Sequence, residues 1–303
     1  MLRRALLFLS RQNRLRNWVQ DSKTAERLTK RFIAGRTLDQ ELAVCGRLQA
    51  EGITSTLDHL GENVASVEES YASRDSYLAA LDGIARLHLQ ATVSVKLTQL
   101  GLDLGDEICM QNCAGLVQRA QSLATCVEID MEASEYVDRT LAVVRAMHER
   151  LGCVRAVVQA YLYRTEKDVD DLCRRRVPVR LVKGAYREPA SVAWPKKTDV
   201  DASFVRLTQK LLDDGVYPAI ATHDEAMIEA TLAHVRQRGL AADRFEFQML
   251  YGIRRDLQRR ITQQGYRLRL YVPYGDAWYP YFMRRLAERP ANVLFIARNL
   301  FRK

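Results

Sequence analysis

The chain alternates short apolar runs with longer stretches of helical periodicity, beginning near residue 52. The runs have the length and the β-branched composition of strands, whereas between them apolar residues recur every three or four positions, as they do on one face of a helix. The predicted strands are 52–57, 92–97, 126–131, 156–162, 177–182, 217–222, 244–250 and 266–272. The predicted helices that alternate with them are 64–88, 106–123, 133–149, 166–175, 201–213, 224–238, 253–264 and 277–289.

Eight repeats of strand and helix predict an α/β protein with a (β/α)8 TIM-type barrel. A doubly wound open sheet is the alternative, but the pattern does not change midway along the chain, and this favours the barrel. Three further helices are predicted before the first strand, at 2–20, 24–34 and 38–50. We therefore expect residues 1–50 to form an N-terminal helical arm and residues 51–303 to form the barrel domain.

Polar residues stand at or just after the ends of the predicted strands, where a barrel of this kind places its catalytic groups. Taken singly, each has an ordinary explanation: Lys96 could extend to solvent, and Asp130 could cap the next helix. Taken together, they would bring many charges to one mouth of the barrel, which is costly unless the charges pair or bind a ligand. These residues are Asp58, Glu62, Lys96, Thr98, Asp130, Glu132, Gln159, Tyr161, Arg180, Lys183, Tyr186, Thr222, His223, Asp224, Gln248, Tyr271 and Tyr274.

The last long motif joins the eighth strand to the closing helix. Pro273 and Gly275 are expected to end the strand, and the helix is expected to stop at Arg289-Pro290. Its apolar stripe and its opposite, polar face follow from the helical period. The stripe comprises Tyr279, Phe282, Met283 and Leu286, and the opposite face Tyr281, Arg284 and Glu288, with Arg285 on the flank. Two adjacent guanidiniums suit a carboxylate ligand, although a solvated face with an Arg284–Glu288 pair is the alternative.

Two loops could serve a cofactor. Lys183-Gly184-Ala185 offers a positive charge and a close approach of the backbone, which suits a phosphate group. The irregular insertion 187–199 could cover part of a bound cofactor or could be an ordinary surface loop. The chain contains no GxGxxG motif, so a Rossmann-type dinucleotide site is not expected.

Composition and charge exclude several classes of protein. The chain is 48% hydrophobic and 27% charged, and no run approaches the roughly 20 apolar residues of a membrane span. The apolar stretch at the N-terminus is too short for a signal peptide and is followed at once by Arg11, Arg14 and Arg16, so we expect an amphipathic helix and a cytoplasmic protein. The net charge of +9 permits attraction to anionic lipid, but no nucleic-acid-binding motif accompanies it.

The six cysteines show neither a CxxC pair nor the Cys/His spacing of a zinc site. We expect them to be reduced thiols, and we expect no metal. They are Cys45, Cys109, Cys113, Cys126, Cys153 and Cys173.

Seven motifs occur in the order found in proline dehydrogenases, and the chain resembles the short, monofunctional bacterial members of that family from about residue 30 to its end. They are Val95-Lys-Leu-Thr, Glu128-Ile-Asp-Met-Glu132, Val158-Gln-Ala-Tyr-Leu-Tyr-Arg, Arg180-Leu-Val-Lys-Gly-Ala-Tyr186, Ala221-Thr-His-Asp224, Phe245-Glu-Phe-Gln-Met-Leu-Tyr-Gly, and Tyr271-Val-Pro-Tyr-Gly followed by Tyr-Phe-Met-Arg-Arg-Leu-Ala-Glu288. The resemblance implies a distorted barrel whose final helix lies over the mouth. It also implies non-covalent FAD, oxidation of L-proline to Δ1-pyrroline-5-carboxylate, and transfer of the electrons to a membrane quinone.

The resemblance also implies roles for individual residues. Arg284, Arg285 and Lys96 match the cations that hold the substrate carboxylate, while Tyr271 and Leu250 match contacts to the proline ring. Arg180 matches the arginine near the flavin N5 edge, and Asp130 matches the carboxylate that steadies the cationic cluster. The positions that match FAD contacts are Met131, Gln159, Lys183, Gly184, Ala185, Thr222, His223 and Glu288, and Glu62 matches an acid that closes the empty site as a gate. Arg187 departs from relatives that carry an aromatic residue there.

These residue types suit the implied chemistry, because a positive charge near a flavin favours its reduced, anionic form and the protein supplies grip and orientation. Two other hypotheses remain at this stage. The chain could be a barrel enzyme of another chemistry, such as a lyase or a folate-type flavin reductase, or a non-catalytic binding protein with the same fold.

Overall fold

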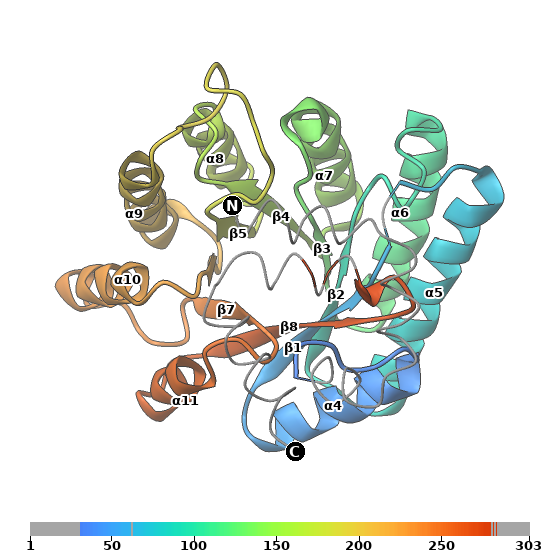
Figure 1. The fold of residues 1–303 in the computed structure, drawn as a ribbon, viewed down its shortest axis with the longest axis horizontal. Coiled ribbons are helices and arrows are strands. Elements are labelled where there is room, and N and C mark those ends of the chain that lie inside the picture. The colour runs from blue at the N-terminus through green and yellow to red at the C-terminus, as the bar shows by residue number, and fades with distance from the viewer. Residues whose placement is uncertain (1–30, 62, 280, 282, 284–303) are drawn as a thin grey trace.

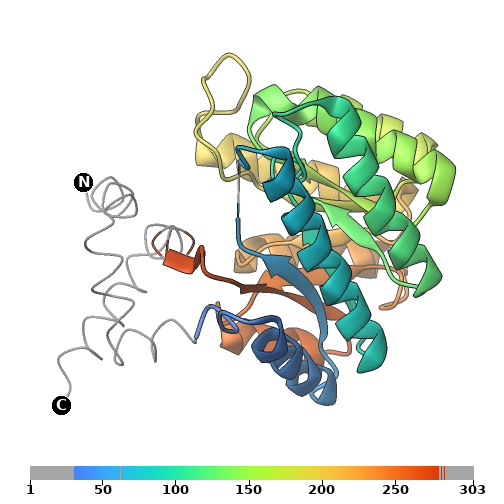
Figure 2. The same cartoon turned by 90° about the vertical axis from the view of Figure 1, so that its right-hand side faces the viewer.

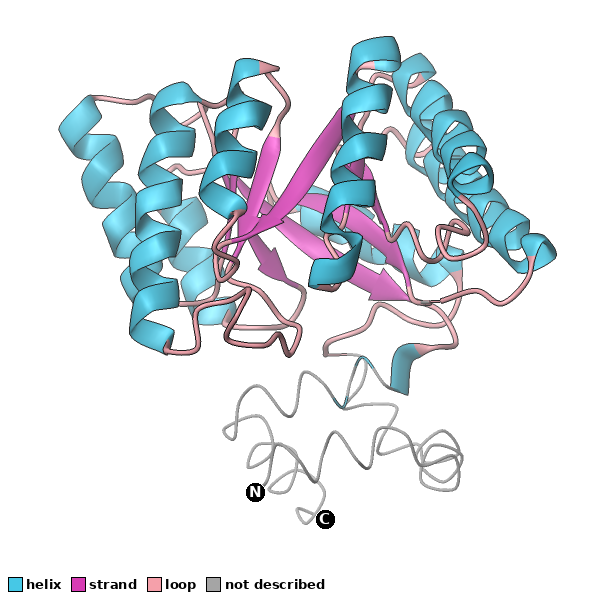
Figure 3. Ribbon diagram, turned by 90° about the horizontal axis from the view of Figure 1, so that it is seen from above, coloured by secondary structure: helices cyan, strands magenta, loops and turns pink. Residues whose placement is uncertain are grey.

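The computed structural model describes residues 31–61, 63–279, 281 and 283. Within this part of the chain, eight parallel strands close into a barrel in the order β1-β2-β3-β4-β5-β6-β7-β8, and β8 pairs with β1. Helices surround the barrel on its outside, and the strands point to one common end (Figures 1 and 3). The predicted α/β barrel is confirmed.

The strands are β1 Thr54–His59, β2 Ala91–Val95, β3 Val127–Ile129, β4 Val154–Gln159, β5 Val179–Val182, β6 Ala219–Ala221, β7 Glu246–Leu250 and β8 Leu268–Tyr274. The helices are α4 Leu38–Ala50, α5 Val67–Arg86, α6 Asp106–Ser122, the 3-10 turn η1 Ser134–Tyr136, α7 Val137–Leu151, α8 Thr165–Arg174, α9 Lys197–Asp214, α10 Glu225–Arg238 and α11 Arg255–Gln263. Each predicted strand from 52 onward and each predicted helix from 38 to 264 has its counterpart. The boundaries differ by a few residues at most.

The segment just before α4 does not follow the sequence prediction. The described part of the helix expected at 24–34 is a turn followed by extended chain, because Ala34 donates its backbone N–H to the carbonyl of Pro273 (2.9 Å) and Gly35 bridges to Tyr274. This segment therefore continues the sheet beside the end of β8. Helix α4 itself begins with a capping box, in which Thr37 and Gln40 bond each other's backbone N–H groups. It packs against β1 and β8.

The prediction that Pro273 ends the last strand is wrong, because β8 runs through it to Tyr274. A proline lacks only the N–H donor and keeps its carbonyl, which here accepts the bond from Ala34. Pro273 still pairs in register with Asp58 of β1. The helix expected at 277–289 lies mostly outside the described residues. Tyr281, expected on its polar face, is buried, as are Tyr279 and Met283.

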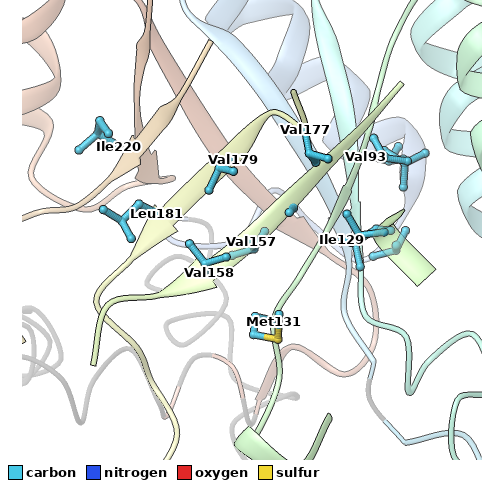
Figure 4. Packing of buried hydrophobic residues seen from close by; sticks show 14 of the residues in the cluster. Val93, Ile129, Met131, Val157, Val158, Val177, Val179, Leu181 and Ile220 are labelled. Carbon is cyan, nitrogen blue, oxygen red and sulfur yellow. The ribbon is translucent and has the colours of Figure 1, made fainter. Parts of the chain in front are cut away.

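The hydrophobic core lies between the outer face of the barrel and the surrounding helices. Successive side chains of a strand point to opposite faces, so alternate Val, Ile and Leu residues face the helices. Figure 4 shows part of this packing around Ile129, Val158, Val179, Leu181 and Ile220, all of them buried. Conversely, the other half of each strand faces the inside of the barrel.

The inside of the barrel is charged, whereas the branched aliphatic filling of many barrels is apolar. Bonds between strands that are not neighbours must cross the interior, and Arg180 of β5 bonds Ser94 of β2, while Gln248 of β7 bonds Glu128 of β3. Among the described residues the interior holds four cations and four carboxylates, so its charges balance. They are Lys96, Arg155, Arg180 and Arg269 with Asp58, Glu128, Asp130 and Glu246.

Candidate active site

The polar residues predicted at the strand ends gather at the C-terminal mouth of the barrel. Asp130 directly follows β3 and Lys96 directly follows β2, while Arg180 lies within β5 and Tyr271 within β8. The strands place them there because parallel strands bring all their carboxyl ends to the same rim. Figures 2 and 3 show that rim, from which β8 leads to the last described helical residues.

Asp130 is the centre of this cluster. Its Oδ1 accepts hydrogen bonds from Arg180 and from the Ser94 hydroxyl (2.8 Å), and its Oδ2 accepts one from the Tyr271 hydroxyl (2.8 Å). The Lys96 Nζ lies 3.6 Å from the same Oδ2. Burial by itself raises the pKa of a carboxyl, but Arg180 and Lys96 outweigh it and hold the pKa of Asp130 below its ordinary value. The carboxylate is therefore ionised and fixed.

Arg180 is 4% exposed and is held from several sides. Besides Asp130, it has Glu128 at 3.2 Å and the Gln248 Oε1 at 3.3 Å, and its guanidinium carbon lies 5.4 Å from the centre of the Tyr271 ring. Burial lowers the pKa of an arginine, but Asp130 and Glu128 outweigh this effect and raise the pKa of Arg180 above its ordinary value. Arg180 thus provides a permanent, oriented positive charge at the mouth.

Lys96 stands between two carboxylates, with its Nζ 3.3 Å from Asp58 Oδ1 and 3.6 Å from Asp130 Oδ2. Asp58 is almost wholly buried within β1. Burial raises the pKa of Asp58, the charge of Lys96 opposes that shift, and the negative charge of Asp130 adds to it. The two acids hold the ammonium group at the mouth, and Lys96 shares Asp130 with Arg180.

A second layer of charge lies beneath this cluster, and the sequence analysis did not assign it a role. Arg155 contacts Glu246 at 2.6 Å and Glu128 at 3.5 Å, and Arg269 contacts Glu246 at 2.9 Å. Burial opposes the ionisation of Glu128, but Arg155 and Arg180 lower its pKa overall. Because Glu128 contacts Arg155 below and Arg180 above, the two layers form one ionic network along the barrel axis.

The described residues predicted to hold a cofactor lie on or just after four adjacent strands, β3, β4, β5 and β6. The Gln159 amide donates to the carbonyl of Glu132 (2.9 Å), and Gln159 is buried. Gly184 has φ +118°, and a Cβ at this position would overlap the ring of Tyr161, so the turn after β5 needs glycine. Ala185, next in the turn, is exposed. A turn without a side chain, backed by an aromatic ring, fits the expected close approach of an FAD molecule to the backbone.

Lys183, whose positive charge was expected to suit a phosphate group, is paired with two carboxylates. Its Nζ contacts Asp201 of α9 and lies 2.8 Å from Asp224 Oδ2. Asp224 also caps α10 through the Ala226 N–H (3.2 Å). Lys197 contacts the same two acids. A phosphate at this turn therefore competes with two carboxylates for Lys183.

The remaining predicted contact residues lie around the same rim. The His223 Nε2 accepts a hydrogen bond from the backbone N–H of Leu250 (2.8 Å), which orients the imidazole and leaves Leu250 half-buried beside it. The Thr222 hydroxyl accepts from the Asp224 N–H (3.1 Å). Met131 is buried directly after Asp130. The structure thus brings these residues to the predicted mouth, and their roles toward a ligand remain predictions.

The insertion 187–199 is tied to the loops that follow β3 and β4. Glu188 accepts hydrogen bonds from the backbone N–H (2.7 Å) and hydroxyl (2.5 Å) of Ser134, and the Trp194 N–H donates to the Tyr161 carbonyl (2.8 Å). Tyr163 and Trp194 meet edge to face with ring centres 4.6 Å apart. In Figure 2 this yellow loop projects at the same end of the barrel as the mouth.

Four predicted site residues lie outside the described part of the chain: Glu62, Arg284, Arg285 and Glu288. In the described ranges no group of three or more His, Cys, Asp or Glu side chains is placed to hold a metal ion. Of the helices among the described residues, none combines the length and the apolar character needed to cross a membrane. All six cysteines are free thiols, and Cys45, Cys109 and Cys113 are buried.

Comparison with known families gives a consistent result. Residues 42–298 match the family model described as proline dehydrogenase. The chain is 40% identical over 301 residues to proline dehydrogenase 2 of Bacillus subtilis, covering 98% of each chain. It is 38% identical over 280 residues to the proline dehydrogenase of Deinococcus radiodurans, covering 91% of this chain and 90% of that protein.

Solved structures share the fold. The structure of proline utilization A from Bdellovibrio bacteriovorus, inactivated by N-propargylglycine, superimposes with a TM-score of 0.81 at 26% identity. The match covers 87% of this chain but 33% of that much longer chain, so the similarity concerns one part of it.

Proposed function

Since the chain belongs to the proline dehydrogenase family, we propose that it is an FAD-dependent enzyme that oxidises L-proline to Δ1-pyrroline-5-carboxylate, the first step of proline catabolism. The observation that carries this proposal is the buried cluster of Asp130, Arg180, Lys96 and Tyr271 at the C-terminal mouth. Two fixed cations and an aromatic ring suit a small amino acid that presents a carboxylate and an apolar ring. This arrangement also disfavours the alternative of a non-catalytic barrel.

In this proposal the chain's own residues bind and orient the substrate. Lys96 attracts the proline carboxylate together with Arg284 and Arg285, which lie outside the described residues. Tyr271 and Leu250 contact the apolar ring. Asp130 does not touch proline; it accepts the hydrogen bonds of Tyr271 and Ser94 and thereby fixes both the phenol and Arg180. Glu62 acts as the gate that pairs with an arginine when substrate is absent.

FAD, when bound, would accept the hydride that leaves the proline carbon next to nitrogen. The residues that would hold it are Met131, Gln159, Arg180, Lys183, Gly184, Ala185, Thr222 and His223, with Glu288 beyond the described residues. The glycine turn at Gly184 supports this assignment because no side chain other than hydrogen fits there. Arg180, buried and permanently charged, would favour the anionic reduced form.

We further propose that the electrons pass to a membrane quinone through peripheral contact at the inner face of the cell membrane. The net charge of +9 supports attraction to anionic lipid. Tyr163, Val192 and Trp194 form an exposed apolar group beside the mouth, 41%, 37% and 37% exposed. Aromatic residues of this kind favour the interface between water and lipid.

A visible spectrum before and after anaerobic addition of L-proline tests the proposal. We expect a flavin absorbance band that bleaches with L-proline and does not bleach with D-proline. A flavin band that stays unchanged with L-proline would exclude proline as substrate while leaving the cofactor assignment in place. A colourless protein that cannot be reconstituted with FAD would refute the proposal as a whole.

A further inference from the structure

The N-terminal end of the barrel contains a cavity on the side opposite the mouth. Its volume is about 1210 Å³, and it is lined by the beginnings of the strands and the loops that precede them. Its wall includes Thr54 of β1, Ala91 of β2, Val154 of β4 and Leu268 of β8, which are the first residues of their strands. Since the strands are parallel, this is the end opposite Asp130 and Arg180.

The cavity carries a surplus of positive charge that comes from Arg176 and Arg267, because Arg155 and Arg269 are paired with Glu246 and Glu128. Its lining contains four arginines, Arg155, Arg176, Arg267 and Arg269, and a single carboxylate, Glu246. Glu246 is already engaged by Arg155 and Arg269, at 2.6 and 2.9 Å. Arg176 and Arg267 are exposed, and within the described residues neither forms an ion pair. A concave surface with surplus charge of one sign concentrates ligands of the opposite sign.

Tyr217 lines this cavity with its backbone in a left-handed conformation. Its φ of +44° lies in the left-handed region, which is uncommon for a bulky residue. Arg155 and Arg267 both lie 5.6 Å from the centre of its ring, and its hydroxyl accepts from Arg267 Nη1 (3.2 Å) and donates to Glu246 (3.2 Å). The strained tyrosine thus holds two guanidiniums in fixed positions. The same left-handed φ occurs at His88, Ala124, Cys153 and Arg176, each in a turn that leads into a strand, so it belongs to the turn geometry of this end of the barrel.

Arg155 also carries an unused donor. The residue is 6% exposed, and its Nε is buried without a hydrogen-bond partner among the described residues. A buried donor that lacks a partner costs about 1–3 kcal/mol, so such groups call for an explanation. Because this Nε is itself closed to solvent, a ligand in the cavity would not reach it, and Arg155 acts here as a buried part of the ionic network.

From these observations we propose that the N-terminal cavity is a binding site for a multivalent oxyanion, a small molecule that carries phosphate or carboxylate groups. Arg176 and Arg267 would contact it, because guanidinium groups pair with such oxyanions through two parallel hydrogen bonds. This site is separate from the proline site, so the proposal does not depend on the catalytic assignment.

Calorimetric titration of the purified full chain tests the site. Pyrophosphate and citrate serve as phosphate and carboxylate probes, and sodium chloride at equal ionic strength serves as the reference. We expect saturable binding of at least one probe with a stoichiometry near one. The double variant Arg176→Gln/Arg267→Gln should bind it at least tenfold more weakly. A control that removes the same charge elsewhere, Arg47→Gln/Arg236→Gln, should bind like the wild type.

The possible outcomes separate a binding site from a purely structural brace. If neither probe binds beyond the chloride reference, or if both double variants weaken binding equally, the proposal is wrong and the cluster only stabilises the barrel. If the Arg176→Gln/Arg267→Gln protein is misfolded, the single variant Arg176→Gln decides, since it should still weaken binding several-fold. If the wild type binds a probe and both double variants keep the wild-type rate of proline turnover, the two sites are distinct.

Discussion

The Tyr271 hydroxyl donates a 2.8 Å hydrogen bond to Oδ2 of Asp130, across the barrel from β8 to the end of β3. The same tyrosine places its ring 5.4 Å from the guanidinium carbon of Arg180, which itself contacts Asp130. One side chain therefore combines an apolar surface for a substrate ring with a polar link to the charged network. Burial, and then the negative charge of Asp130, raise the pKa of Tyr271 well above its ordinary value, so the phenol remains a donor.

Removing that hydroxyl tests how much the link contributes. Tyr271→Phe keeps the ring and deletes one hydrogen bond to a charged acceptor, which is worth about 1.5–3 kcal/mol. We expect kcat/KM for proline to fall by roughly tenfold to a hundredfold with bound flavin retained. Steady-state kinetics and the flavin-to-protein absorbance ratio measure the two effects.

Tyr266→Phe is the matched control for that variant. Tyr266 packs against Phe245 and Phe247 outside the mouth, so loss of its hydroxyl should leave proline kinetics unchanged. Equal kinetic effects in the two variants, or none in Tyr271→Phe, would show that the Asp130 link is not part of substrate handling.

The two arginines of the last motif provide a second prediction. If Arg284 and Arg285 hold the proline carboxylate, as the family resemblance implies, Arg284→Met or Arg285→Met removes a charge-assisted contact worth about 2–4 kcal/mol. The proline concentration needed for half-maximal flavin reduction should then rise by roughly 30-fold or more, while FAD stays bound. Arg236→Met, an exposed arginine on α10, is the control. If Arg284→Met or Arg285→Met leaves the proline dependence of flavin reduction unchanged, that arginine does not hold the proline carboxylate.

Gly184 provides a third prediction. Alanine there meets the Tyr161 ring and must adopt a φ of +118°, so the turn after β5 has to move. Such strain costs about 1–3 kcal/mol. We expect Gly184→Ala to lower the melting temperature and to weaken FAD retention after gel filtration.

Gly115→Ala is the control for this substitution, because it lies within α6 and a Cβ there has no neighbour within 4 Å. It should be neutral or slightly stabilising, since alanine favours helix. A Gly184→Ala protein that keeps wild-type stability and full flavin content would mean that FAD does not lie close to the backbone of this turn.

The fold could be predicted from the sequence because its signal is periodic and repeated. Eight strand segments alternate with helical segments along the chain, and errors at single boundaries do not change their number. The exceptions are local and non-periodic. Residues 31–35 gain their conformation from pairing with the end of β8, about 240 residues later, and Pro273 stays in its strand for the same reason. No local pattern encodes a contact of that separation.

The mouth residues could be predicted from their places at strand ends, but the layer beneath them was missed. A signal existed: Glu128, Glu246 and Arg269 each lie two positions before a predicted mouth residue, namely Asp130, Gln248 and Tyr271. Because side chains alternate along a strand, residues two positions apart face the same side of the sheet. The pairing of Lys183 with Asp201 and Asp224 was not predictable, because it depends on how α9 and α10 pack.

A fourth prediction concerns Glu41, which is fully buried on α4 and whose two carboxyl oxygens have no hydrogen-bond partner among the described residues. Burial, and then the nearby charge of Asp58, raise its pKa well above the ordinary value. The folded protein therefore keeps this proton at a pH where the unfolded chain, near its ordinary pKa of about 4.5, has lost it. The resulting stability is fully present below that pH and is lost as the pH rises toward the folded-state pKa.

Glu41→Gln removes this dependence because an amide does not titrate. Between pH 5 and pH 8 the wild type should lose more unfolding free energy than the variant, by up to about 1.4 kcal/mol for each pH unit within the window. Urea unfolding at several pH values measures the difference. Glu51→Gln, an exposed glutamate at the end of the same helix, should keep the wild-type pH dependence. Parallel pH profiles for wild type and Glu41→Gln would show that Glu41 is ionised in the folded protein.

The exposed group Tyr163, Val192 and Trp194 supports the last prediction. Two hydrogen bonds hold the loop in the position that exposes these side chains. The Tyr163 backbone N–H donates to the Val192 carbonyl (3.1 Å), and the Tyr163 hydroxyl donates to the Ala190 carbonyl (2.9 Å). The exposed cations Arg187 and Lys196 flank it. An aromatic tip with basic neighbours suits the interface of an anionic bilayer.

If this tip brings the mouth to the bilayer, the double variant Tyr163→Ser/Trp194→Ser should sediment less with phosphatidylglycerol vesicles and turn over more slowly with a quinone embedded in them. Its turnover with a water-soluble electron acceptor should stay at the wild-type level, because neither residue belongs to the Asp130 cluster. Tyr71→Ser/Leu87→Ser removes two other exposed apolar side chains, 38% and 47% exposed, and should behave like the wild type in every assay. If both double variants lose vesicle binding and quinone turnover equally, the effect comes from general surface hydrophobicity and not from this tip. A Tyr163→Ser/Trp194→Ser protein that binds vesicles normally would mean that the membrane contact, if present, is made by another part of the chain.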